Sequence, residues 1–158
     1  IFLDDYIDPA NVDVVDWSPM LALNPKPGME DTVYKKLVHA NPHLKVYRKA
    51  EVPERLHYRH HRRIPAIIGI ADEGWSVTTH AKFEARPYYF TGGNHGFDNQ
   101  LASMGGIFVA RGPAFKSGLV VEPFENIQIY NLMATILHLK PAPNEGHLSA
   151  VRDMLTLK

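Results

Sequence analysis

The chain has 158 residues, 45% of them hydrophobic, which is enough for one core of ordinary domain size. Its 17 Lys and Arg residues balance 17 Asp and Glu residues, so no overall electric field favours nucleic acid or an anionic membrane. The absence of cysteine excludes disulfides and thiolate zinc sites, and it leaves the redox compartment undecided. The longest apolar run, residues 64–71, is too short to span a membrane and suits a buried strand.

The first third of the chain predicts short strands and one helix. Apolar, β-branched runs in residues 1–6 and 12–23 predict strands, interrupted by two prolines. Residues 30–40 predict a helix, because apolar residues recur on one face and acidic residues occupy its first turn. Residues 44–48 alternate between apolar and polar side chains, a pattern that predicts an edge strand.

The remaining elements include the two most apolar segments. Residues 64–71 and 107–111 each predict a central strand, the first one buried on both faces within a parallel or mixed sheet. Residues 75–79 predict a returning strand. Apolar residues at i, i+3, i+4, i+7 and i+8 predict a helix over residues 126–139, and a shorter one is expected over residues 148–155.

Residues 55–63 form the most basic segment, with four arginines and three histidines. The spacing of His57 and His60 is compatible with a metal pair, and the arginines are suited to gripping phosphate. The alternative is a solvated basic connector that leads into the following strand. We favour the connector, because arginines beside the histidines disfavour a bound cation.

Two further motifs allow more than one interpretation. Asp72 and Glu73 follow a predicted strand, where a metal or an acid–base site could lie. We favour a turn in which Asp72 bonds to nearby backbone amides and Trp75 packs against the protein. Residues 88–90, Tyr-Tyr-Phe, are either a strand or an aromatic surface near a substrate opening, and we assign them no role.

The strongest candidate site is the glycine-rich loop Gly-Gly-Asn-His-Gly-Phe-Asp-Asn of residues 92–99. Glycines on both sides of His95 let the backbone approach a ligand or adopt positive φ. A histidine on a polar loop next to an apolar run is a common way to present a metal ligand. On these residues alone, His95 is either a metal ligand or a hydrogen-bonded loop histidine.

A set of short motifs occurs in a fixed order and spacing along most of the chain, densest from residue 53 to residue 144. The set comprises Arg63-Ile64-Pro65, Ala71-Asp72-Glu73-Gly74-Trp75, His95-Gly96-Phe97-Asp98-Asn99, Met104, Ile107-Phe108, Gly112-Pro113-Ala114-Phe115, Pro123-Phe124-Glu125-Asn126-Ile127, Tyr130-Asn131-Leu132-Met133 and Pro141-Ala142-Pro143-Asn144. Each motif is weak by itself, but the ordered set is highly specific. It resembles the C-terminal part of the nucleotide pyrophosphatase/phosphodiesterase family, within the alkaline phosphatase superfamily.

The resemblance implies an α/β fold, with residues 1–158 as the C-terminal portion of an alkaline-phosphatase-like α/β/α sandwich whose N-terminal part is absent. Enzymes of this family cleave phosphodiester or pyrophosphate bonds with two zinc ions and a threonine nucleophile. His95 matches the family's last histidine ligand to zinc, and we expect Asp98 to be an outer-shell acceptor for its ring. In the family, the basic segment and the Asp72-Glu73 pair are not metal ligands.

The resemblance places the remaining catalytic groups outside this chain. The sequence contains neither the Thr-x-Pro-Asn nucleophile turn nor the Asp-His-Gly-Met metal motif. We therefore expect no catalytic residue in this portion, no activity from it alone, and a requirement for the N-terminal part of the same domain as its partner. Nucleotides cleaved to nucleoside monophosphates are the expected substrates, and the expected location is periplasmic or extracellular. The alternatives are a choline-phospholipid phosphodiesterase of the same family, and a non-catalytic α/β module.

Overall fold

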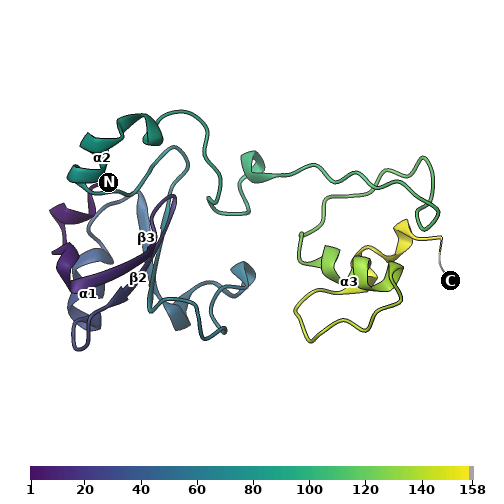
Figure 1. The fold of residues 1–158 in the computed structure, drawn as a ribbon, viewed down its shortest axis with the longest axis horizontal. Coiled ribbons are helices and arrows are strands. Elements are labelled where there is room, and N and C mark those ends of the chain that lie inside the picture. Colours follow the sequence, from purple (N-terminus) through teal and green to yellow (C-terminus); the bar gives the residue numbers. More distant parts are fainter. Residues whose placement is uncertain (157–158) are drawn as a thin grey trace. The chain divides into compact units, whose positions relative to one another are not determined.

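The computed structural model describes residues 1–156. The chain forms two compact units, Ile1–Gly106 and Ile107–Lys158. The first unit contains a four-stranded sheet with the helices α1 and α2, and the second contains the helix α3 (Figure 1). The candidate site belongs entirely to the first unit.

The sheet has the strand order β1-β2-β4-β3, and every neighbouring pair is antiparallel. Its strands are β1 (Val12–Asp16), β2 (Met20–Pro25), β3 (Leu44–Arg48) and β4 (Ile67–Ala71). The predictions of an edge strand at β3 and a central strand at β4 are confirmed. The expectation of a parallel or mixed sheet is wrong for these strands, because both neighbours of β4 run opposite to it.

Side chains of β2 and β4 alternate between two buried faces, as expected for strands covered on both sides. On the first face, Leu21, Leu23 and Ile67 pack with residues of α1 (Glu30–Leu37). The buried residues of that helix are Val33 and Leu37, one turn apart on the same side. The helix predicted over residues 30–40 is therefore confirmed, although it ends three residues earlier than expected.

The second face of the sheet is covered by irregular chain rather than by a helix. Ala22 and Ile68 pack there with Val52, and Leu56 and Tyr58 contribute partly buried side chains. These covering residues belong to or follow the short 3-10 helices η3 (Lys49–Glu51) and η4 (Glu54–Leu56). This face supports the candidate site.

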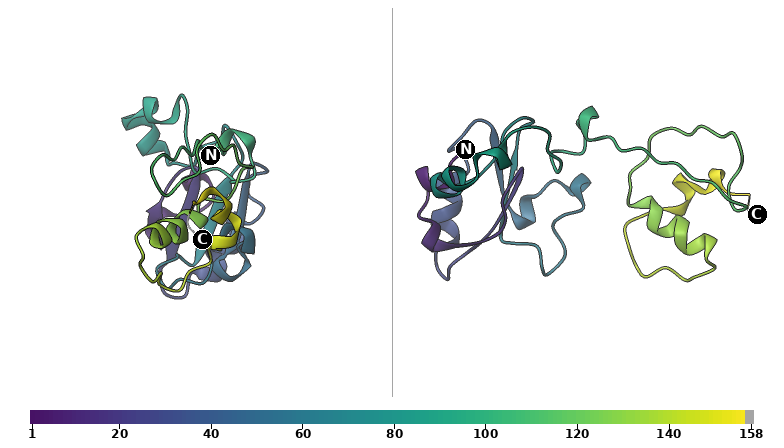
Figure 2. Two further views of the ribbon diagram at one scale, coloured as in Figure 1. Left: turned by 90° about the vertical axis from the view of Figure 1, so that its right-hand side faces the viewer. Right: turned by 45° about the horizontal axis from the view of Figure 1, so that its top comes forward.

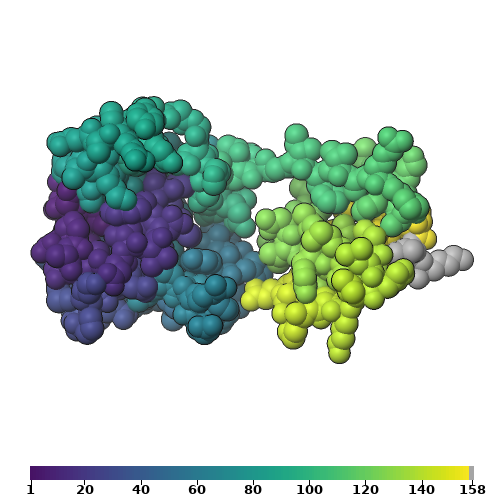
Figure 3. Space-filling model, in the orientation of Figure 1, coloured from purple at the N-terminus to yellow at the C-terminus, as the bar shows by residue number. Residues whose placement is uncertain are grey.

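The N-terminal residues lie beside α2 (His80–Ala85), as the purple and teal segments show (Figure 3). The ring of Phe2 stacks on His80 with 3.9 Å between centroids and meets Phe83 edge-on at 5.6 Å. The strands predicted over residues 1–6 and 75–79 are wrong. These segments share only the isolated bridge between Phe2 and Thr78, too short a pairing to extend into a ladder.

The second unit is built around α3 (Gln128–Ile136), beside which the yellow C-terminal turns lie (Figure 2). Its small core contains Leu132 together with Val151, Met154 and Leu155. The helix predicted over residues 126–139 is confirmed in a shorter form. Two 3-10 turns, Leu148–Ala150 and Arg152–Met154, replace the helix predicted over residues 148–155.

The strand predicted over residues 107–111 is absent from the described structure, which is the largest departure from expectation. Ile107 is 95% exposed and Val109 is 84% exposed. An isolated extended segment forms no ladder hydrogen bonds, so β-branched composition alone cannot make it a strand.

Residues Pro87–Phe90 form a 3-10 helix with exposed tyrosines. Of the two interpretations of this segment, a strand or an aromatic surface, the strand is therefore wrong. Among the described helices, none is long and apolar enough to cross a membrane.

Candidate functional site

The His95 loop, residues 92–99, makes a tight bend that depends on glycine. Gly92 and Gly96 have φ values of +89° and +93°, which side chains with a Cβ rarely adopt. A Cβ on Gly96 would also touch the ring of Pro19, at 3.5 Å from its Cδ, so the loop runs close to the start of β2. His95 itself is exposed, and its backbone N–H donates to Asn94 Oδ1 at 2.9 Å.

The second half of this loop lies over the second face of the sheet. Gly96, Phe97 and Asp98 line a hollow of about 200 Å³ together with Met20 of β2 and two isoleucines of β4. The last residues of the loop therefore lie over the sheet, and the exposed bend with His95 comes before them.

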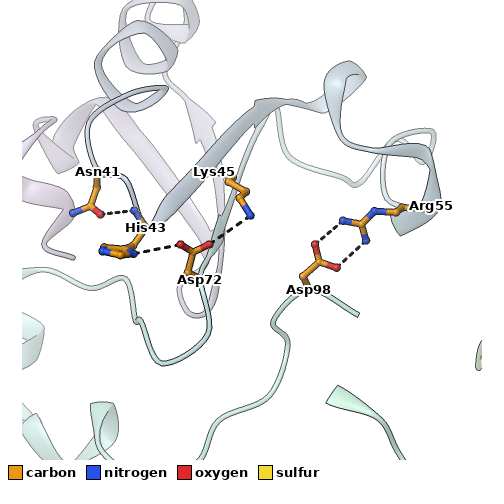
Figure 4. Close-up of polar contacts among 6 residues, drawn as sticks. All are labelled: Asn41, His43, Lys45, Arg55, Asp72 and Asp98. Atoms are coloured by element: carbon orange, nitrogen blue, oxygen red, sulfur yellow. Dashed lines mark hydrogen bonds and ion pairs between the residues drawn. The ribbon is translucent and has the colours of Figure 1, made fainter. Parts of the chain in front are cut away.

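Asp98 joins the loop to the basic segment through a two-pronged ion pair with Arg55 (Figure 4). Arg55 Nη1 donates to Asp98 Oδ1 at 2.8 Å, and Arg55 Nη2 donates to Asp98 Oδ2 at 2.5 Å. Arg55 Nη1 also donates to Asn99 Oδ1 at 3.0 Å. Parallel N–H···O bonds of this kind fix both the distance and the orientation of the two groups.

This ion pair sets the protonation of the carboxylate. The Arg55 guanidinium, helped by the backbone N–H of Gln100, lowers the pKa of Asp98 from 3.8 to about 2, against an opposing effect of burial. In return, the hydrogen bond to Asp98 raises the pKa of Arg55 above its ordinary value. Both groups are therefore fully charged near neutral pH.

Asp72 makes a separate set of contacts at the end of β4 (Figure 4). Its carboxylate lies 3.3 Å from His43 Nδ1 and 3.5 Å from Lys45 Nζ. Trp75 stacks on His43 with 4.0 Å between ring centroids, and the backbone N–H of Trp75 donates to the backbone carbonyl of Asp72 at 3.0 Å. The turn favoured from the sequence is confirmed, but the Asp72 side chain bonds to other side chains rather than to backbone amides.

The histidines and the last two arginines of the basic segment are solvated, which agrees with the connector favoured from the sequence. His60, His61, Arg62 and Arg63 are exposed. Arg55 and Arg59 are only partly exposed. Arg59 pairs with the neighbouring Glu54, whereas Arg55 bonds to the distant Asp98 and Asn99. Sequence reasoning missed the role of Arg55, and nothing in its local pattern distinguishes it from the other arginines.

The donor set within residues 1–156 limits what this portion can do with a metal. No group of three histidine, aspartate or glutamate side chains comes together in that range to enclose a cation. The His95 imidazole is exposed and has no hydrogen-bond or ion-pair partner among the described residues, so it is available to a ligand. Imidazole nitrogen is a preferred zinc donor, so the chemistry of His95 fits one ligand position.

Comparison with known protein families identifies the family to which this part of the chain is similar. The sequence profile described as "Type I phosphodiesterase / nucleotide pyrophosphatase" matches residues 1–98, which include the His95 loop up to Asp98. The chain belongs to this family. The match covers well over half of the chain, so it confirms the resemblance inferred from the ordered motifs.

Individual relatives extend the similarity to nearly the whole chain. Human ectonucleotide pyrophosphatase/phosphodiesterase family member 5 is 41% identical over 155 residues, covering 98% of this chain and 31% of the relative. The mouse bis(5'-adenosyl)-triphosphatase enpp4 is also 41% identical over 155 residues, covering 98% of this chain and 32% of the relative. The chain thus spans about a third of the length of these relatives.

Solved structures agree with the sequence matches. The structure of human family member 5 superposes with a TM-score of 0.84 at 40% identity, covering 99% of this chain and 40% of that one. An inactive form of the murine protein, in complex with AMP, gives a TM-score of 0.83 at 39% identity. These matches confirm the expected fold class, a portion of an alkaline-phosphatase-like α/β fold.

Proposed function

We propose that this chain is the C-terminal part of a zinc-dependent hydrolase that cleaves phosphodiester or pyrophosphate bonds of nucleotides and releases nucleoside monophosphates. The observation that carries the proposal is the position of His95. Its imidazole is exposed and unpaired among the described residues, and it lies on a glycine-dependent bend within the segment that matches the family. A zinc ligand must present a neutral imidazole nitrogen in this way.

In this proposal, His95 supplies one ligand of a two-zinc site, and the N-terminal part of the domain supplies the others together with the nucleophile. Bound zinc would polarise the phosphoryl oxygens and lower the pKa of the attacking group. The contribution of this chain is to hold the imidazole of His95 in place and to keep Asp98 ionised beside the bend. Asp98 stays our proposed outer-shell residue, although both of its oxygens accept bonds from Arg55.

A nucleotide substrate is supported by the names of two relatives. The mouse relative is a bis(5'-adenosyl)-triphosphatase, and the murine family member 5 structure contains AMP. The competing substrate is a choline-type phospholipid diester. Because several relatives are ectonucleotide enzymes by name, we also propose an extracellular or periplasmic location.

The test of the ligand assignment is His95→Ala in the complete domain. We expect turnover to fall by roughly 100-fold or more, beyond the 10- to 100-fold typical of outer-shell partners. Zinc affinity should fall as well. With zinc removed by a chelator, the unfolding free energy should change by less than about 0.5 kcal/mol, because His95 is exposed.

The matched control is His39→Ala, which removes an exposed histidine that follows α1 and should leave zinc affinity and turnover unchanged. Turnover within a few-fold of wild type in His95→Ala would refute the ligand assignment. Comparing p-nitrophenyl thymidine monophosphate with p-nitrophenyl phosphorylcholine decides between the two substrate classes. A preference for the choline ester would refute the nucleotide assignment while keeping the family.

A further inference from the structure

The His95 loop has few contacts of its own that could fix its shape. Around the bend, the backbone N–H of His95 bonds to the neighbouring Asn94 side chain. Exposed glycine-rich segments of this kind have many accessible backbone conformations. A metal ligand on such a loop needs an anchor, because its imidazole must return to one position each time the metal binds.

The anchor in this structure is a long-range one. Arg55 lies 43 residues before Asp98 in the sequence, and its guanidinium bonds to both carboxylate oxygens of Asp98 and to Asn99. Within the loop, Asp98 Oδ1 also accepts from the N–H of Gln100 at 3.0 Å, and the Asp98 carbonyl accepts from the N–H of Leu101 at 3.1 Å. Asp98 is thus fixed from two directions.

Arg55 is itself held by the sheet. It belongs to the 3-10 helix η4, whose last residue, Leu56, packs on the second face together with Tyr58. The segment before it is also fixed, because the N–H of Lys49 donates to the Ala66 carbonyl, next to β4, at 2.8 Å. The guanidinium therefore projects from a supported turn toward the loop (Figure 4).

We propose that Arg55 is a positioning residue that holds the metal-binding loop through Asp98 and Asn99, and so determines where the His95 imidazole lies. The inference rests on the proposed function, since it assumes that His95 binds zinc. It also assigns Asp98 a specific task. The carboxylate orients the loop by accepting the Arg55 fork, three residues after the ligand.

The geometry distinguishes this role from a general contribution to stability. The Arg55 and Asp98 side chains are 36% and 26% exposed, and neither belongs to a hydrophobic cluster of the unit. Exposed and half-exposed ion pairs contribute little to global stability. Loss of the pair should therefore loosen the loop far more than it destabilises the fold.

The experiment compares Arg55→Ala, Arg55→Lys and Arg59→Ala in the complete domain. Arg59 is a matched control, because it lies in the same segment but pairs with the exposed Glu54. The measurements are zinc affinity by chelator competition, amide hydrogen exchange of residues 92–101, and thermal unfolding with zinc removed.

We expect Arg55→Ala to weaken zinc binding by about 10- to 100-fold, the range found for outer-shell partners, and to speed exchange in the loop. Arg55→Lys keeps the charge but not the planar fork, so it should recover only part of both effects. Arg59→Ala should resemble wild type. The double variant Arg55→Asp/Asp98→Arg, which reverses the pair, should bind zinc more tightly than either single variant.

Zinc affinity within two-fold of wild type in Arg55→Ala would overturn the inference. So would a loss of zinc affinity in Arg55→Ala without faster loop exchange, because the effect would not act through loop position. The zinc affinity of His95→Ala distinguishes the failure of one proposal from the failure of the other. If His95→Ala leaves zinc affinity unchanged, the proposed function fails and this inference fails with it; if only the Arg55 variants leave it unchanged, the positioning role alone fails.

Discussion

Asp98 shows how one neighbour can fix the charge of a side chain. Its carboxylate is partly buried, which by itself would raise its pKa, yet the Arg55 guanidinium holds that pKa at about 2. The bonded pair joins residues from two loops, and neither loop has regular secondary structure at the point of contact other than the single turn η4. Ionisation of Asp98 and the position of the His95 loop are therefore coupled.

This coupling predicts a pH dependence of stability. The pKa of Asp98 is lower in the folded protein than its ordinary value of 3.8, so the ion pair stabilises the fold above pH 3.8 and loses its effect as pH falls toward 2. The contribution should be on the order of 1 kcal/mol after screening by solvent.

The measurement is urea unfolding of wild type and Asp98→Asn between pH 6 and pH 2.5, roughly the range over which this linkage acts. Wild type should be more stable at pH 6, and the difference between the two should shrink as the pH approaches 2.5. Other carboxylates titrate in both proteins and cancel in the comparison. A difference in unfolding free energy that stays constant over this range would show that Arg55 does not lower the pKa of Asp98.

At the scale of elements, α3 depends on polar contacts as much as on its small core. The side-chain amides of Asn131 and Asn144 exchange two hydrogen bonds, at 2.9 and 3.0 Å. Asn131 Nδ2 also donates to the Gly146 carbonyl at 2.6 Å, and Gln128 Oε1 accepts from the N–H of His147 at 2.5 Å. These bonds fasten the proline-rich segment after α3 against the helix.

The close approach of backbone at Gly146 predicts a sensitive position. A Cβ there would collide with the carbonyl oxygen of Ile127 and lie 3.0 Å from Asn131 Nδ2. Gly146→Ala should therefore destabilise the second unit by about 1–3 kcal/mol, as overpacking typically does. Chemical unfolding followed by hydrogen exchange of α3 would measure this loss.

The control for this prediction is Gly106→Ala, because a Cβ on Gly106 would meet no atom within 4 Å. That variant should unfold within about 0.5 kcal/mol of wild type, as for other surface substitutions. Equal stability of the Gly146 and Gly106 variants would mean that the proline-rich segment can move away from α3 without loss of stability, and would contradict the prediction.

At the scale of the whole molecule, this chain spans about a third of the length of its relatives and supplies one proposed zinc ligand. A site with one imidazole binds zinc weakly, since catalytic zinc sites generally use three protein ligands. The activity proposed here therefore belongs to the complete domain.

The corresponding prediction concerns residues 1–158 prepared alone. They should show no turnover of p-nitrophenyl thymidine monophosphate above background, with or without excess zinc, because the nucleophile and the other ligands are expected elsewhere. The assay should be repeated after adding the purified N-terminal part of a family member, when zinc-dependent activity is expected. Turnover by the chain alone that disappears on chelation would contradict this division of the site.

Local sequence patterns were sufficient to predict two of the strands and two of the helices. Alternation predicted the edge strand at Leu44–Arg48, apolar composition predicted the central strand at Ile67–Ala71, and helical periodicity predicted α1 and α3. The prediction of a strand at residues 107–111 was wrong. A strand also needs a neighbouring strand for its backbone hydrogen bonds, and the composition of the segment does not show whether such a neighbour exists.

The sequence by itself determined the family, the fold class and the candidate status of His95, since these depend on residue types in a fixed order. Only the tertiary structure decided that β4 lies between two antiparallel neighbours and that Arg55, among four similar arginines, is bonded to Asp98. The physical reason is that Arg55 and Asp98 are 43 residues apart, and their pairing depends on how the two loops lie over the second face of the sheet. Local sequence periodicity contains no information on this arrangement.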